Sequence, residues 1–173
     1  MDIHMTETKN NLKKPVFLFA VLLICVLAVA GGMMVSQMVR ADARTLSGEG
    51  VHWNSGNWKV VNFFAAWCAP CLREIPALNT LHDSMGENVK FYGVSYDGGS
   101  QQELQQLVDE LNVAFPVLDT STDTTLPMKY PDYLPATYLI SPDGKVADAL
   151  YGEQTEASLR ARLSELAAGG HNN

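Results

Sequence analysis

The stretch Val60–Pro76, which reads VVNFFAAWCAPCLREIP, constrains the fold of this chain more than any other. Its first residues are apolar except for Asn62, and they are rich in Val and Phe, which predicts a buried central strand over Lys59–Ala65. Pro70 is favoured in the first turn of a helix, and the apolar residues after it recur at helical spacing. The stretch therefore predicts a strand, a short turn and a helix, with two cysteines at the turn.

These cysteines, Cys68 and Cys71, are separated by two residues. At this spacing both sulfurs lie within one helical turn and can form a disulfide without movement of the backbone. Cys68 would lie at the helix N-terminus, where unpaired N–H groups and the helix dipole favour a thiolate and lower the thiol pKa. We therefore expect Cys68 to be the exposed nucleophile and Cys71 to be the shielded thiol that resolves a mixed disulfide.

Metal binding is the alternative interpretation of such a cysteine pair. A zinc site with four cysteine ligands needs a second pair, but the only other cysteine is Cys25, which lies in an apolar segment. The histidines do not stand at ligand spacing either, so redox chemistry is favoured over zinc binding. A module that holds Cu(I) between Cys68 and Cys71 is kept as an alternative function.

Glu74 is the third candidate residue, because it follows Cys71 by three positions and so shares its side of the predicted helix. A carboxylate beside a shielded thiol could accept or return the proton of that thiol as the disulfide forms and opens. The alternative is a surface glutamate without a role in the chemistry.

The N-terminal segment carries a second strong signal, since no charged residue occurs between Val16 and Val39. This run is long enough to span a bilayer, and the lysines before it favour a cytoplasmic N-terminus and an extracytoplasmic domain. A cleaved signal peptide is the competing interpretation, because Ala28–Ala30 resembles a cleavage site. The apolar run continues beyond that site, so we expect an uncleaved anchor in the inner membrane.

The predicted organisation follows from this anchor and from the charge of the rest of the chain. After residue 40 the chain carries 8 basic and 17 acidic residues, a net charge of −9, which argues against nucleic-acid binding. We expect five parts: a cytoplasmic tail over 1–15, the anchor over 16–39, a polar tether over 40–50, a catalytic domain over 51–168, and a C-terminal tail over 169–173.

Periodicity and turn residues predict the elements of the catalytic domain. Besides Lys59–Ala65, strands are expected over Val51–Trp53, Val89–Tyr96, Phe115–Leu118, the residues from Pro135 to Ile140, and Lys145–Tyr151. Helices are expected from Pro70 to Met85 with Pro76 inside, over Gln101–Leu111, and over Thr155–Ala168. This order predicts an α/β fold with a central mixed sheet flanked by helices.

The motif Trp67–Cys71 after an apolar strand resembles the thioredoxin superfamily, which implies a thioredoxin-like fold. The continuation Cys71–Pro76 is similar to the membrane-anchored TlpA/ResA/CcmG branch of thiol-disulfide oxidoreductases, and the match extends over about Lys59–Ala168. Thioredoxin itself has a buried aspartate where this chain has Asn62. The same position is often asparagine in the TlpA-like branch, so the difference favours that branch.

The resemblance also implies roles for individual residues. It makes Glu74 an active-site residue and Pro135 a cis-proline that faces the cysteine pair. Together with Trp67 and Leu134, Pro135 is expected to line the substrate groove. Supporting roles are expected for Asn62, Ala69 and Pro70.

The expected activity is reduction of protein disulfides, because Ala69 and Pro70 offer no charge to stabilise a thiolate and Glu74 adds negative charge. A disulfide oxidase or isomerase on the same fold is the alternative. No cofactor is expected beyond the redox-active Cys68–Cys71 disulfide. The resemblance suggests a disulfide-bonded protein such as apocytochrome c as substrate, and a membrane or periplasmic thiol reductant similar to DsbD or CcdA as electron donor.

Overall fold

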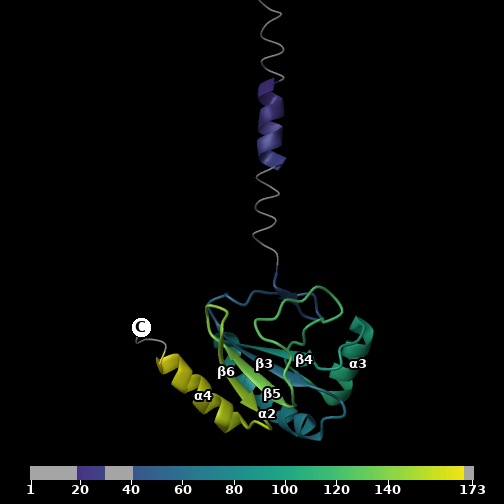
Figure 1. The fold of residues 1–173 in the computed structure, drawn as a ribbon, viewed down its shortest axis with the longest axis vertical. Helices are drawn as coiled ribbons and strands as arrows, with labels where there is room; N and C mark the ends of the chain where they lie inside the picture. Colours follow the sequence, from purple (N-terminus) through teal and green to yellow (C-terminus); the bar gives the residue numbers. More distant parts are fainter. Residues whose placement is uncertain (1–18, 30–40, 170–173) are drawn as a thin grey trace, which may run out of the picture. The chain divides into compact units, whose positions relative to one another are not determined.

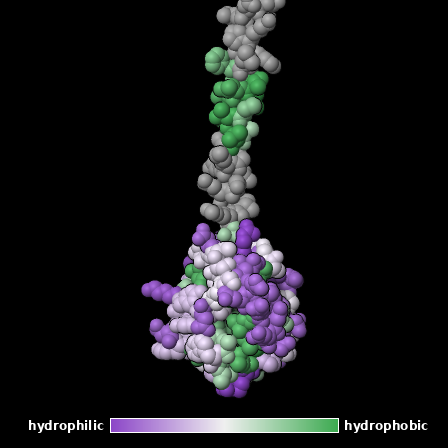
Figure 2. All heavy atoms as spheres, turned by 90° about the vertical axis from the view of Figure 1, so that its right-hand side faces the viewer, coloured by the Kyte–Doolittle hydropathy of each residue, from purple (hydrophilic) through white to green (hydrophobic). Residues whose placement is uncertain are grey.

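The computed structural model describes residues 19–29 and 41–169, and the chain divides into two units between Arg40 and Ala41. Residues 19–29 form a helix whose side chains are exposed, and its surface is hydrophobic in Figure 2. The rest of the predicted anchor, the predicted cytoplasmic tail and residues 170–173 lie outside the described residues. Among the residues that are described, no helix combines the length and the apolar character that a membrane crossing requires.

A four-stranded mixed sheet forms the centre of the second unit, with the strand order β4-β3-β5-β6 (Figure 1). The central strand β3 (Trp58–Phe64) pairs in parallel with β4 (Val89–Ser95) and antiparallel with β5 (Ala136–Ile140). β5 pairs antiparallel with β6 (Val146–Tyr151). The prediction of an α/β fold with a mixed sheet is confirmed, and each predicted strand of this sheet agrees to within one residue at each end.

The helices are α2 (Ala69–Met85), α3 (Gln101–Leu111) and α4 (Glu156–Gly169), and a short 3₁₀ helix, η1 (Gly86–Asn88), follows α2. α2 continues through Pro76 to Met85, as predicted. Thr155 caps α4, because its Oγ1 accepts a hydrogen bond from the N–H of Ser158 at 3.1 Å. Helices therefore begin and end close to the positions that their capping and turn residues indicate.

Each face of the sheet has its own apolar cluster, because successive residues of a strand point to opposite faces. Val60 and Phe64 of β3 lie in one cluster with both cysteines of the motif and with buried leucines of α2 and α4. Val61 and Phe63 lie in the other cluster, which includes Trp53. Asn62 shares the face of Val60 and Phe64, so its side chain points toward α2.

The predicted tether over residues 40–50 is wrong, because this segment is folded from residue 41 onward. β1 (Ala43–Arg44) pairs antiparallel with β2 (Gly50–Val51), and Ala43 and Thr45 are buried. The strand predicted over Val51–Trp53 therefore begins earlier and ends at Val51. Strands of two residues are too short to show the alternation by which a strand is recognised in a sequence.

The strand predicted over Phe115–Leu118 is also wrong. This segment makes two isolated bridges, Gly93 with Val117 and Thr45 with Leu118, and forms no continuous strand. Its apolar residues are buried because they close both clusters beside β4 and β1. The segment thus pairs at single residues only, and burial of its side chains accounts for the apolar pattern.

Candidate active site

The start of α2 positions the cysteine pair. Cys68 is the N-cap residue of this helix, and Ala69 and Pro70 form the beginning of its first turn. The Sγ of Cys68 accepts a hydrogen bond from the backbone N–H of Cys71 at 3.3 Å. The predicted placement of Cys68 at a helix N-terminus is confirmed, and this N–H group would stabilise negative charge on its sulfur.

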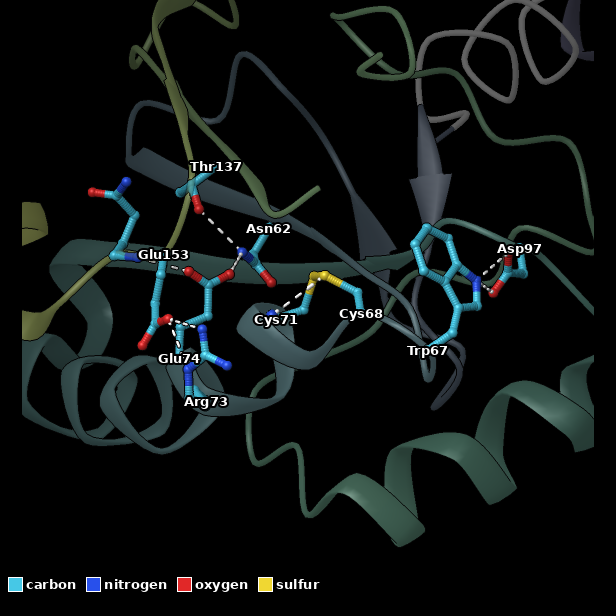
Figure 3. Close-up of a disulfide and its surroundings, with 10 residues drawn as sticks. Asn62, Trp67, Cys68, Cys71, Arg73, Glu74, Asp97, Thr137 and Glu153 are labelled. Carbon is cyan, nitrogen blue, oxygen red and sulfur yellow. Dashed lines mark hydrogen bonds and ion pairs between the residues drawn. A yellow bond between two sulfur atoms is a disulfide. The ribbon is translucent and has the colours of Figure 1, made fainter. Parts of the chain in front are cut away.

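Cys68 and Cys71 form a disulfide, with their Cα atoms 5.3 Å apart (Figure 3). Cys71 is fully buried, as predicted, but Cys68 is only 4% exposed and so is not the exposed residue that we expected. The reason is that both cysteines pack in the apolar cluster between the sheet and α2. In this oxidised form Cys68 is the less buried of the two.

Glu74 lies one turn further along α2 and is 1% exposed, so the alternative of a surface glutamate is wrong. Its two carboxylate oxygens have different partners: Oε1 accepts from Asn62 Nδ2 at 2.7 Å, and Oε2 accepts from the backbone N–H of Gln154 at 2.8 Å. Burial raises the pKa of Glu74, and the two hydrogen bonds oppose part of this rise. A raised pKa makes this carboxylate a better proton acceptor than that of an ordinary glutamate.

Asn62 connects this carboxylate to the sheet. Its Nδ2 also donates to Thr137 Oγ1 at 3.0 Å, and Thr137 is the residue opposite Asn62 in the pairing of β3 with β5. Figure 3 shows Asn62 between Glu74 and the disulfide. The structure thus brings Cys68, Cys71, Asn62 and Glu74 into one buried site.

Trp67 forms the outer edge of the site and is 65% exposed. Its indole Nε1–H donates to both carboxylate oxygens of Asp97, at 2.8 and 3.1 Å, and its ring meets that of Tyr96 edge to face. Asp97 was not among the predicted residues. A signal for it existed, because Trp67 follows β3 and Asp97 follows β4, and neighbouring parallel strands end at the same edge of a sheet.

The peptide bond between Leu134 and Pro135 is cis. Pro135 is buried at the start of β5, and its carbonyl oxygen accepts a hydrogen bond from the N–H of Gly152 at 2.9 Å. Leu134 is partly buried and packs against both apolar clusters. The adjacent Tyr133 is exposed and contacts the ring of Tyr151 edge to face, an aromatic pair that the sequence did not indicate.

Two further neighbours of the site come from distant segments. Gln154 lies before α4 and reaches Glu74 through its backbone, and Glu153 forms an ion pair with Arg73 at 2.7 Å. No local sequence pattern indicated these contacts, because they depend on how the end of β6 meets α2. Among residues 19–29 and 41–169, no group of three or more His, Cys, Asp or Glu side chains is placed to hold a metal ion.

Comparison with known proteins identifies the family of this chain. The model of the AhpC/TSA family matches residues 38–149. The chain belongs to the AhpC/TSA family. In this chain the redox-active group is the disulfide between Cys68 and Cys71 at the N-terminus of α2.

Named relatives of this AhpC/TSA protein define the activity. The thiol-disulfide oxidoreductase ResA of Oceanobacillus iheyensis is 30% identical over 113 residues, which cover 65% of this chain and 58% of that protein. ResA of Bacillus anthracis is 26% identical over 172 residues, covering 90% of this chain and 99% of that protein. The resemblance to ResA-type proteins is therefore confirmed, and the chain is a thiol-disulfide oxidoreductase with Cys68 and Cys71 at CxxC spacing.

A solved structure supports the fold of this AhpC/TSA protein. StoA from Bacillus subtilis superimposes with a TM-score of 0.58 at 23% sequence identity, over 69% of this chain and 92% of that one. At this identity the likeness concerns the fold alone, and it confirms the prediction of a thioredoxin-like fold.

Proposed function

We propose that this oxidoreductase works as a reductase of protein disulfides. The observation that carries the proposal is the environment of the cysteine pair. Only Ala69 and Pro70 separate the two cysteines, and the carboxyl of Glu74 is buried three residues after Cys71 on the same helix. Strong oxidants stabilise their thiolate, whereas here neither residue between the cysteines is charged and a buried acid follows Cys71.

The proposed cycle transfers two electrons to the substrate. Cys68 attacks the substrate disulfide, Cys71 then attacks the mixed disulfide, and the substrate leaves as a dithiol while the Cys68–Cys71 disulfide forms. A thiol reductant must then return two electrons to this disulfide. A membrane-bound or periplasmic protein similar to DsbD or CcdA fits the role of this reductant. A disulfide-bonded protein such as apocytochrome c fits the role of the substrate. Trp67, Leu134 and Pro135 would line the groove for the substrate.

Equilibration with glutathione tests the direction of electron flow. We expect the reduction potential of the Cys68–Cys71 pair to lie nearer to about −270 mV, the value of thioredoxin, than to about −120 mV, the value of DsbA. The fraction of disulfide would be measured by trapping thiols in acid with an alkylating reagent, with Cys25→Ser present in every sample to leave only the active-site thiols. A potential near that of DsbA would instead favour the oxidase alternative.

We also propose that the N-terminal segment anchors the enzyme in the inner membrane and that the catalytic domain is extracytoplasmic. The charge-free run from Val16 to Val39 and the lysines that precede it support this placement. A reporter that is active only outside the cytoplasm, fused after Asn173, is expected to be active. Activity of a cytoplasm-only reporter at the same position would contradict the orientation, and a mature N-terminus at Gly31 would contradict the anchor.

A further inference from the structure

One polar atom beside the disulfide lacks a partner. Asn62 is 2% exposed, and its Nδ2 makes the two hydrogen bonds described above. Its Oδ1 is buried and accepts no hydrogen bond from the residues that the structure describes. A buried amide oxygen without a donor is unfavourable, so this atom is a candidate acceptor for a group that acquires a proton during the reaction.

The orientation of the Asn62 carboxamide follows from its partners. Each oxygen of the Glu74 carboxylate can only accept hydrogen bonds. Oε2 accepts the backbone N–H of Gln154, and Oε1 therefore needs a donor from Asn62. The amide nitrogen must therefore face Glu74, and the amide oxygen must face away from it. Figure 3 shows this oxygen directed toward the Cys68–Cys71 disulfide.

Reduction of the disulfide creates the missing donor. The two sulfurs are bonded to each other in the oxidised form, so neither carries a proton. After reduction, Cys68 Sγ is the better place for negative charge, because it is the N-cap atom that accepts the N–H of Cys71. Cys71 is fully buried and retains its proton, and a buried S–H group needs an acceptor.

We propose that the Sγ–H of Cys71 donates a hydrogen bond to Asn62 Oδ1 in the reduced enzyme. Asn62 is then a positioning residue: it holds the Cys71 thiol protonated beside the carboxyl of Glu74 while Cys68 attacks the substrate. This hydrogen bond exists only in the dithiol form, so it favours the dithiol over the disulfide. The inference concerns the enzyme's own dithiol and holds for either direction of electron flow.

The role of Asn62 is consistent with the balance of the reaction. Cys68 thiolate forms a bond to one substrate sulfur, and the substrate S–S bond breaks to release a thiolate that takes a proton from solvent. Cys71 then gives its proton to the carboxylate of Glu74, forms a bond to Cys68 Sγ, and expels the second substrate sulfur as a thiolate that takes a proton from solvent. The hydrogen bond to Asn62 Oδ1 is lost at the step in which Cys71 loses its proton.

Infrared spectroscopy of the S–H stretch tests the hydrogen bond directly. In full-length protein with Cys25→Ser and Cys68→Ser, the only thiol is that of Cys71. Its S–H band is expected at a lower frequency than that of a thiol without an acceptor, and Asn62→Leu should raise it. Thr137→Val is the matched control, because the Thr137 hydroxyl accepts its hydrogen bond from Nδ2 of Asn62, and it should leave the band in place.

The redox equilibrium supplies a second readout that a merely structural role would not change. With both active-site cysteines present, Asn62→Leu is expected to shift the equilibrium with glutathione toward the disulfide by about three- to tenfold, the effect of one hydrogen bond. Thr137→Val should shift it by less than about twofold if the hydrogen bond to Oδ1 is what matters. A folded Asn62→Leu variant with the wild-type equilibrium would overturn the proposal. If Asn62→Leu does not fold, the S–H band of Cys71 in the protein that retains Asn62 tests the proposal instead. A band at the frequency of a thiol without an acceptor would refute the inference.

Discussion

Replacing Cys71 by serine is expected to abolish turnover and to leave the protein joined to its substrate through Cys68. Cys68 is the less buried sulfur and the N-cap atom of α2, so it can still attack a disulfide. Release of the mixed disulfide requires a second thiolate within reach, and Cys71 is the partner that the structure provides. A serine hydroxyl does not replace it, because an alcohol is far less acidic than a thiol and forms no disulfide.

The measurement is capture of covalent complexes by Cys71→Ser, separated without reductant and identified by mass spectrometry. Complexes should disappear on reduction and should be absent from a Cys68→Ser, Cys71→Ser double variant. Cys25→Ser is the control for the remaining cysteine, and it should capture no more substrate than wild type. Rapid turnover by Cys71→Ser, or trapping through Cys25, would contradict the assignment of the pair. The captured protein would also show whether apocytochrome c is a substrate.

Glu74→Gln is expected to slow disulfide exchange by about a hundredfold, the low end of the range for general acid–base catalysis. Glutamine fills nearly the same volume but cannot take up the proton that Cys71 must lose. The expected loss lies in the step that resolves the mixed disulfide, so that complexes accumulate in the variant. Stopped-flow kinetics with a model disulfide substrate would measure it. Glu110→Gln, at an exposed position of α3, is the matched control and should leave the rate unchanged. A wild-type rate for Glu74→Gln would make Glu74 a structural residue only.

The same substitution has a predicted effect on the pH dependence of stability. Burial raises the pKa of Glu74 in the folded protein above its ordinary value of 4.5, so the folded state holds this proton more tightly than the unfolded state does. The free energy of unfolding should therefore decrease as the pH rises from 4.5 through the raised pKa, and then level off. Glu74→Gln should remove this part of the pH dependence. Denaturant unfolding of both proteins across that range would test it, and parallel curves would contradict a raised pKa.

The sequence by itself determined the reactive element of this protein. The apolar run of β3, Pro70 in the first turn and the spacing of the cysteines are local signals, and each acts within a few residues. They sufficed to predict a strand that leads into a helix with Cys68 at its N-terminus. Helix α3 was likewise predicted with its observed ends, because its apolar stripe is a local signal; the structure adds a Ser100–Glu103 capping box at its start.

Only the tertiary structure decided what surrounds the cysteine pair. The position of Glu74 on the Cys71 side of α2 could be predicted from helical spacing, but one of its hydrogen-bond donors is the backbone of Gln154, which lies 80 residues further along the chain. The contacts of Asn62 depend on the register between β3 and β5, and the burial of Cys68 depends on how the sheet and α2 pack.

The prediction for the N-terminal part of the domain, a tether over residues 40–50, was wrong for a related reason. β1 and β2 are two residues long each, and one residue of each strand, Ala43 and Val51, is buried in the cluster on the face of the sheet that carries Val61 and Phe63. Periodicity reports which side of an element is apolar, whereas burial and hydrogen-bond partners are set by contacts between segments that are far apart in sequence. Local sequence signals therefore identified the cysteine pair, whereas long-range packing determined the burial and the hydrogen bonds of Glu74 and Asn62 beside it.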